Sequence, residues 1–399
     1  MRRSTQAARL GNAVRRRIWW VLLGLGLVLA VAAVVAYVVI GRFVNLGGQL
    51  GEGGEARVAT PRGFAASIFA DGLDGPRFIA FGPDGVLHVA DRGSGRILAL
   101  PDTDGDGVAD ERRVVARGLE GVHSLTHHDG AWYAGIPSGI VRLDDTDGDG
   151  VADQRVAVVD DYPTDGSHST RTVAFLPDGR MVVSIGSSCN VCREQDPRRA
   201  AIVVYDGPDG AGERVLASGL RNAVGLAVHP TTGELWATNN GRDLLGDDLP
   251  PETVYRIRDG ADYGWPDCIN GTMEDPDEGA AGACDGVDRP VVEMQAHSAP
   301  LGMTFYTGDA YPAEYRDDLF IALHGSWNRS ELTGYKIVRL PFEGDDPADA
   351  VEDFATGWLD ETTGEVAGRP VGLAVGPDGA LYMSDDKAGF IYRINYAGG

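Results

Sequence analysis

Positive charge is scarce in this sequence. The 399 residues include 35 lysines and arginines against 59 aspartates and glutamates, which gives a formal net charge of −24. Six of the arginines stand within the first 40 residues, which contain no acid, so the rest of the chain carries −30. A surface of that sign repels the phosphate backbone, and the sequence therefore argues against nucleic acid as a partner.

Nucleotide-binding signatures are absent and cysteines are few. No Walker or Rossmann glycine pattern stands between a strand and a helix, which argues against a nucleotide cofactor. The four cysteines form two local pairs, Cys189 with Cys192 and Cys268 with Cys284. In an oxidising compartment these pairs predict two disulfides. Cys189 and Cys192 also have redox or zinc spacing, but no second metal-like pair accompanies them, and Arg193 replaces the histidine of c-type haem attachment.

One long uncharged apolar run, residues 18–40, follows the arginine-rich start. Its length spans a bilayer, and arginines on its N-terminal side keep that end in the cytoplasm. We therefore expect a cytoplasmic tail at 1–17, a transmembrane signal anchor at 18–40 and a flexible stalk at 41–56. The remainder, 57–399, would lie outside the cytoplasmic membrane. Cleavage of the anchor as a signal peptide is the alternative.

A short phrase recurs along residues 57–399: an apolar run, a turn of the Pro-Asp-Gly kind, and a second apolar run. Its six copies stand at 78–89, 122–133, 173–183, 224–236, 301–322 and 371–383. The second copy is degenerate, and the fifth carries a long insertion. Each copy predicts a β-hairpin, and repetition at this period predicts an all-β fold, a six-bladed β-propeller preceded by one transmembrane helix.

The phase of the repeat sorts the loops onto two faces. Because hairpin strands are antiparallel, residues before the first strand and after the second lie on the same face of the propeller. The residues of interest at these positions are His168, Arg221, Asn222, Gly241, Arg242, Arg329, Arg369 and Asp385. The end of the propeller channel on this face, called the mouth below, is a common ligand site, although structural polar networks also line such channels.

Two kinds of chemistry are available at this mouth. The imidazole of His168 could accept a proton near neutral pH. Converging arginines in an acidic protein suit a small ligand with several carboxylates, with pairing to neighbouring acids as the alternative. The stretch 241–252 offers carbonyl and carboxylate oxygens, which suit Ca²⁺ or simply form a solvated acidic loop.

Two near-identical acidic segments follow the third strands of the first two blades. Their acids are Asp102, Asp104, Asp106 and Asp110, and then Asp145, Asp147, Asp149 and Asp153. The spacing matches the first part of a calcium loop, but Arg113 and Val156 stand where a bidentate acid is expected. We expect these loops on the face away from the mouth, either holding Ca²⁺ or forming metal-free Asp/Gly turns.

The order of several phrases resembles the soluble quinoprotein glucose and sorbosone dehydrogenase family, six-bladed propellers that use pyrroloquinoline quinone with Ca²⁺. The phrases begin at Ser167, Cys189, Gly219, Gly246, Asp262, His324 and Gly368. They include Ser-His168-Ser-Thr-Arg, Gly-Leu-Arg221-Asn222 and His-Gly-Ser-Trp-Asn-Arg329. The resemblance covers the chain from about Pro61 to Tyr396.

The resemblance implies a role for each matching position. His168 would remove the proton of the sugar hydroxyl. The quinone would be held by Arg221, Asn222 and Arg369, with Asp385 beside them and Arg329 in place of a lysine. Carbonyls of Gly241 and Arg242 would hold the active-site Ca²⁺, and Asp248 and Tyr263 would belong to a second, structural Ca²⁺ site.

Two departures point away from the glucose branch and towards the sorbosone branch. Val224 stands where the glucose branch has an amide, and Ser187 where it has an acid. The sequence thus predicts a membrane-anchored dehydrogenase that oxidises an aldose or sugar aldehyde and passes electrons to a quinone or cytochrome. A calcium-dependent lactonase-like hydrolase and a non-catalytic extracellular binding module are the alternatives.

Overall fold

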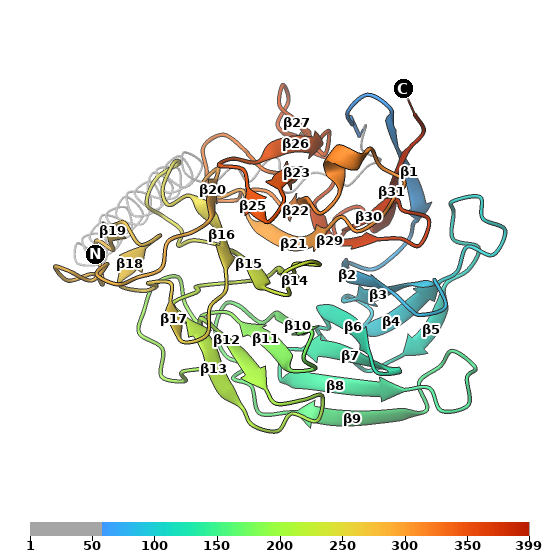
Figure 1. The fold of residues 1–399 in the computed structure, drawn as a ribbon, viewed down its shortest axis with the longest axis horizontal. Coiled ribbons are helices and arrows are strands. Elements are labelled where there is room, and N and C mark those ends of the chain that lie inside the picture. Colours follow the sequence, from blue (N-terminus) through green and yellow to red (C-terminus); the bar gives the residue numbers. More distant parts are fainter. Residues whose placement is uncertain (1–57, 399) are drawn as a thin grey trace, which may run out of the picture.

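The computed structural model describes residues 58–398, and in this part of the chain 24 strands form six four-stranded antiparallel sheets around a common centre (Figure 1). The predicted six-bladed propeller is confirmed. The predicted tail, anchor and stalk lie outside the described residues. Within residues 58–398, no helix has the length and apolar character needed to cross a membrane.

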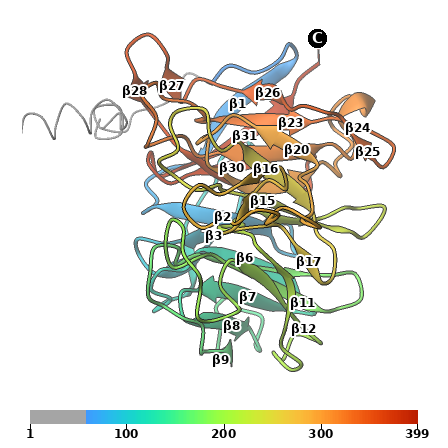
Figure 2. The same ribbon diagram turned by 90° about the vertical axis from the view of Figure 1, so that its left-hand side faces the viewer.

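Each blade runs outward from an inner strand. Blade 1 is β2 (Pro76–Phe81), β3 (Leu87–Asp91), β4 (Arg96–Leu100) and β5 (Arg113–Ala116). Blade 2 is β6 (Ser124–His128), β7 (Ala131–Ile136), β8 (Gly139–Asp144) and β9 (Gln154–Val159). Blade 3 is β10 (Arg171–Phe175), β11 (Met181–Ile185), β12 (Ala201–Tyr205) and β13 (Arg214–Ser218), to which β17 (Ala261–Asp262) adds in parallel. Blade 2 is seen strand by strand in Figures 1 and 2.

The second half repeats the pattern. Blade 4 is β14 (Leu226–Val228), β15 (Leu235–Asn239), β16 (Glu252–Arg256) and β20 (Val292–Met294). Blade 5 is β21 (Pro300–Phe305), β22 (Leu319–Leu323), β23 (Lys336–Leu340) and β26 (Glu352–Ala355). Blade 6 is β29 (Pro370–Val375), β30 (Leu381–Asp385), β31 (Phe390–Tyr396) and β1 (Phe64–Ala70).

Short elements decorate the loops between these strands. They are the pairs β18 (Cys268–Ile269) with β19 (Met273–Glu274), β24 (Phe342–Glu343) with β25 (Asp346–Pro347), and β27 (Leu359–Asp360) with β28 (Glu365–Val366), and the 3-10 helix η1 (Ala313–Tyr315). The insertion expected in the fifth hairpin carries η1. Its Tyr306, Tyr311 and Tyr315 join an aromatic cluster.

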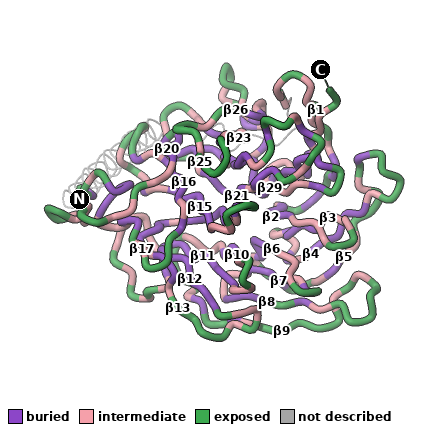
Figure 3. Tube along the Cα trace, in the orientation of Figure 1, coloured by how far each residue is buried: buried purple, intermediate pink, exposed green. Residues whose placement is uncertain are grey.

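The apolar core lies between neighbouring blades. Six buried clusters are each shared by two adjacent blades, because alternate side chains of a strand face the two sides of its sheet. A smaller cluster of Val224, Leu301 and Val371 joins inner strands near the axis. Figure 3 shows burial concentrated in the strands and exposure in the connecting loops.

The ring closes through the two ends of the described chain. Strand β1 pairs antiparallel with β31 along Phe64–Ala70, so one blade combines an N-terminal strand with three C-terminal ones. Phe64 packs edge-on against Tyr311, Tyr315 and Phe354, with ring centroids 4.7, 5.1 and 5.1 Å away. This contact ties the closing strand to blade 5.

Truncating Phe64 should therefore weaken ring closure. We expect Phe64→Ala to lower the free energy of unfolding by about 3 kcal/mol, since a large aromatic side chain is removed from a packed site. Urea unfolding followed by tryptophan fluorescence measures the change. Val108→Ala, at a side chain that is 48% exposed, is the control and should leave the midpoint nearly unchanged. An unchanged midpoint for Phe64→Ala would contradict this account.

Candidate active site

A cavity of about 310 Å³ opens at the end of the propeller where the first strand of each hairpin begins and the second ends. Its walls come from the loops before β10, β14, β21 and β29, from those after β15 and β22, and from the first residues of β2 and β16. Of the predicted mouth residues, His168, Arg221, Asn222, Gly241 and Arg369 line it. The phase of the repeat therefore located the face correctly.

His168 is held by the loop that follows β11. Its Nδ1 lies 2.8 Å from the carbonyl oxygen of Ser187 and 3.0 Å from the Ser187 Oγ. A carbonyl only accepts hydrogen bonds, so Nδ1 carries the proton and Nε2 is left as the basic nitrogen. Burial, reinforced by the charge of Arg221, lowers the pKa of His168 to about 4. The imidazole is therefore neutral across the physiological range and suited to accept a proton.

Arg221 is saturated by the protein itself. Its Nε donates to the Asn190 carbonyl, at 2.9 Å. One terminal nitrogen donates to the carbonyls of Asn240 and Gly241, and the other to Asn190 Oδ1 and Asp243 Oδ2. The five N–H groups of the guanidinium thus meet five protein acceptors. Although Arg221 lines the cavity, it acts here as a brace for the wall.

Arg369 and Asn222 keep free donors at the cavity. Arg369 gives Nε and Nη2 to the carbonyls of His324 and Gly325, at 3.0 and 2.7 Å. Its Nη1 makes no hydrogen bond within residues 58–398, and neither does the side-chain amide of Asn222. These groups fit the predicted recognition of a carboxylate or carbonyl oxygen.

Asp385 lies behind Arg369 and does not line the cavity. It is fully buried, and its Oδ1 accepts the backbone N–H groups of Arg369, Lys387 and Ala388. Burial raises the pKa of Asp385 to about 6. The contacts make Asp385 a support for the backbone that carries Arg369.

The sequence reasoning assigned no role to three residues of the site, Arg77, His324 and Asp386. Arg77 and His324 line the cavity, and both bind Asp386, with His324 Nε2 lying 2.9 Å from Asp386 Oδ1. Burial opposes ionisation of Asp386, but His324 and Arg77 hold its pKa well below the usual range. Burial lowers the pKa of His324 to about 4. Arg77 follows Pro76, which stands at the same repeat position as Pro370 beside Arg369, and this signal could have found it.

Oxygen atoms gather on the wall next to Arg221. The Gly241 carbonyl, Asp243 and Glu252 all belong to residues that line the cavity. Asp243 accepts Asn328 Nδ2 at 2.9 Å, and Glu252 accepts the Gly241 N–H at 2.7 Å. Burial raises the pKa of Glu252 to about 8. Carbonyl and carboxylate oxygens are the ligands that Ca²⁺ prefers, so this wall has the donor chemistry of a calcium site.

Other predicted metal and cofactor residues lie elsewhere. The guanidinium of Arg242 points away to Asp275 and Asp277. Arg329 bridges to the Asp247 carbonyl and to Asp248, at the rim. Tyr263 is buried, and its hydroxyl donates to the Arg256 carbonyl, so the structure gives Asp248 and Tyr263 separate partners.

The Asp-rich segments form loops between β4 and β5 and between β8 and β9, as expected. In each loop three carboxylates have oxygens within 4.8 Å of one another, and these are Asp102, Asp104 and Asp110, and Asp145, Asp147 and Asp153. Asp106 and Asp149 instead cap their own turns through the N–H groups of Val108 and Val151. Calcium binding there remains a prediction.

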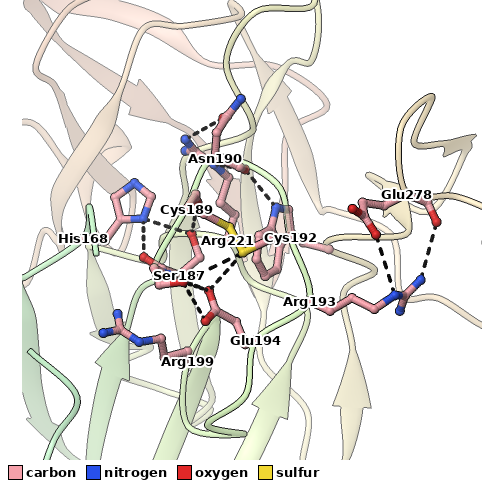
Figure 4. Close-up of a disulfide and its surroundings, with 12 residues drawn as sticks. His168, Ser187, Cys189, Asn190, Cys192, Arg193, Glu194, Arg199, Arg221 and Glu278 are labelled. Carbon is pink, nitrogen blue, oxygen red and sulfur yellow. Dashed lines mark hydrogen bonds and ion pairs between the residues drawn. A yellow bond between two sulfur atoms is a disulfide. The ribbon is translucent and has the colours of Figure 1, made fainter. Parts of the chain in front are cut away.

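Both predicted disulfides are confirmed, Cys189–Cys192 and Cys268–Cys284. The first stands beside His168 and Arg221 (Figure 4). Because both cysteines of the first pair are joined in a disulfide, neither offers a free thiol for zinc binding or redox chemistry.

Comparisons with known proteins agree with this fold. The family model described as TrAA12-like matches residues 58–397. A pyrroloquinoline quinone-dependent pyranose dehydrogenase of Coprinopsis cinerea is 27% identical over 84% of this chain and 54% of its own length. An uncharacterized protein of Borreliella burgdorferi is 34% identical over 57% of this chain and 61% of its own. The chain thus spans about half to three fifths of these curated relatives.

A solved structure extends the likeness to three dimensions. The holo form of the quinone domain of the Coprinopsis cinerea pyranose dehydrogenase superposes with a TM-score of 0.74 at 25% identity. The match covers 86% of this chain and 98% of that domain.

The buried imidazoles predict a loss of stability in acid. His168 and His324 protonate near pH 6.5 in the unfolded chain but only near pH 4 in the fold. As pH falls from 6.5 towards 4, the unfolded state binds protons first, so the stability present above pH 6.5 is progressively lost. Each imidazole contributes up to about 3 kcal/mol to this loss. Urea unfolding at pH 7, 6, 5 and 4.5 measures it.

His168→Gln should reduce this pH dependence by about half, because glutamine does not titrate and His324 remains. His128→Gln, outside the mouth, is the control and should keep the wild-type slope. Equal slopes for wild type and His168→Gln would show that the imidazole titrates normally in the fold.

Proposed function

The chain belongs to the TrAA12-like family, and from this premise we propose that it is a quinoprotein dehydrogenase that uses pyrroloquinoline quinone and Ca²⁺. The observation that carries the proposal is the mouth itself. A neutral imidazole, free guanidinium and amide donors, and an oxygen-rich wall border one cavity. The substrate class we propose is an aldose or a sugar aldehyde.

The donor groups fit the cofactors. Arg369 and Asn222 would hold the carboxylates and carbonyl oxygens of the quinone, with Arg77 as a further donor. The Gly241 carbonyl, Asp243 and Glu252 would face Ca²⁺, which also favours the ionised form of a buried carboxyl such as Glu252. When bound, the quinone supplies the acceptor for the hydride that leaves the sugar carbon, and Ca²⁺ acts on it as a Lewis acid.

The chain's own residues would manage the proton and the orientation of the substrate. His168 Nε2 accepts the proton of the sugar hydroxyl, while Ser187 holds Nδ1–H and so fixes the tautomer. Because the pKa of His168 is about 4, the base stays available in weak acid. The His324–Asp386–Arg77 group keeps its charges paired within the wall.

Reconstitution tests the proposal. We expect the purified chain with pyrroloquinoline quinone and Ca²⁺ to reduce a redox dye with at least one sugar of a panel. His168→Ala should keep quinone binding but lose about 10²–10⁴-fold in kcat, the usual contribution of a general base. Arg369→Ala should weaken quinone binding, followed by the absorbance of the quinone. The acid limb of kcat/KM should lie near pH 4 rather than 6.5.

Arg112→Ala, at a side chain that is 46% exposed and pairs, among residues 58–398, only with Asp71, is the matched arginine control and should behave as wild type. Absence of both quinone binding and dye reduction would reject the proposal. Quinone-independent hydrolysis of a sugar lactone would favour the hydrolase alternative, which Asp243 and Glu252 in the cavity could serve as metal ligands.

We also propose that residues 18–40 anchor the propeller outside the cytoplasmic membrane and that electrons pass to a membrane quinone or a cytochrome. The arginine-flanked apolar run supports this location. Expressed in full, the chain should sediment with membranes and resist extraction by carbonate, and protease added to spheroplasts should degrade the propeller. Recovery of the full-length chain in the soluble fraction would contradict the anchor.

A further inference from the structure

The Cys189–Cys192 disulfide closes a four-residue loop directly behind the wall of the cavity. The loop follows β11, and its residues do not line the cavity. Figure 4 shows His168, Ser187, Asn190 and Arg221 around the disulfide, with His168 and Ser187 to its left and Asn190 above it. Its contacts therefore reach two different parts of the site.

One arm of the loop is Asn190. Its carbonyl accepts Arg221 Nε at 2.9 Å, and its Oδ1 accepts Arg221 Nη2 at 3.0 Å. The same side chain pairs with the backbone of Asp243, accepting the N–H at 2.7 Å and donating Nδ2 to the carbonyl at 3.1 Å. One asparagine thus fixes both Arg221 and the oxygen-rich wall.

The other arm is Ser187. Its Oγ donates to the Cys189 carbonyl at 2.7 Å, and this leaves an oxygen lone pair for His168 Nδ1. The Ser187 carbonyl accepts from the same Nδ1. Where a carboxylate would orient a basic imidazole by charge, this chain uses a neutral serine whose own position depends on the loop.

The disulfide supplies the rigidity that both arms need. A four-residue covalent ring leaves Asn190 and the Cys189 carbonyl few alternative positions. Outside the ring, Ser188 is held by Glu194, and Arg193 by Asp267 at 2.5 Å. Hydrogen bonds to a charged guanidinium and within a buried wall depend strongly on such placement.

We propose that the Cys189–Cys192 loop is the positioning element of the active site, with Asn190 positioning Arg221 and Asp243, and Ser187 carrying the same constraint to His168. The inference deepens the proposed function, because it assigns roles to residues that touch neither the quinone nor the sugar. The same loop would then position both His168 and the oxygen-rich wall next to Arg221, so one substitution in the loop should disturb both.

Three variants of the full chain in detergent test the idea: Asn190→Ala, Asn190→Asp and the double variant Cys189→Ser/Cys192→Ser. Quinone binding is titrated at fixed Ca²⁺, and the His168 imidazole is titrated by NMR in the cofactor-free protein, with its signal assigned from His168→Gln. We expect Asn190→Ala and the cysteine variant to bind the quinone about tenfold more weakly. Their His168 should protonate at higher pH, because Arg221 moves away from it.

Asn190→Asp keeps the oxygen that receives Arg221 and should stay within about threefold of wild type. Cys268→Ser/Cys284→Ser is the matched control. That disulfide closes a longer loop, so its loss should cost more stability. Its loop contacts Arg242, Pro251 and, through Glu278, the exposed side chain of Arg193. None of the three lines the cavity, so quinone affinity and the His168 titration should stay near wild type.

Wild-type affinity and imidazole titration in both Asn190→Ala and Cys189→Ser/Cys192→Ser would overturn the inference, as would equal losses in the two cysteine variants. If the wild-type chain binds no quinone, the proposed function fails instead. The imidazole titration then still decides the positioning role, because it needs no cofactor.

Discussion

The pairing of β1 with β31 is the constraint on which the rest of the molecule depends. A blade alone exposes both faces of its sheet, and only a closed ring gives each face a neighbour. Closure brings the six inner strands together at one end, where their loops enclose the cavity. The site is thus a property of the ring, because every blade except blade 2 supplies residues to its wall.

The cavity gathers arginines inside a strongly acidic protein. Burying them is possible because each is matched locally: Arg77 by Asp386, Arg221 by Asp243, and Arg369 by backbone carbonyls. Charges so paired keep their guanidinium groups fixed. The arginines differ in how many N–H groups the protein itself leaves without an acceptor. Arg221 has none left and supports the wall, whereas Arg369 keeps Nη1 available for a ligand.

Histidine chemistry in the mouth follows from the same arrangement. Neighbouring guanidinium groups and burial both disfavour the imidazolium, so His168 and His324 are neutral. His324 is oriented by a carboxylate and His168 by a serine and a carbonyl. Because no carboxylate orients His168, its orientation depends on the position of Ser187. The Ser187 hydroxyl is in turn bound to the Cys189 carbonyl in the Cys189–Cys192 loop.

The sequence by itself determined the architecture and the face that carries the cavity, because a hairpin repeat fixes strand direction and so sorts loops before their contacts are known. The local pairing of the four cysteines determined the two disulfides. The sequence also placed His168, Asn222 and Arg369 at the mouth, where they line the cavity. Only the tertiary structure decided that Arg221 is fully occupied, that Asp385 is buried behind Arg369, and that Arg77 and Asp386 join His324. Those outcomes depend on partners from distant blades: Arg77 and Asp386 are 309 positions apart. A local sequence pattern does not contain these distant partners, so it cannot show which N–H groups of an arginine remain free for a ligand.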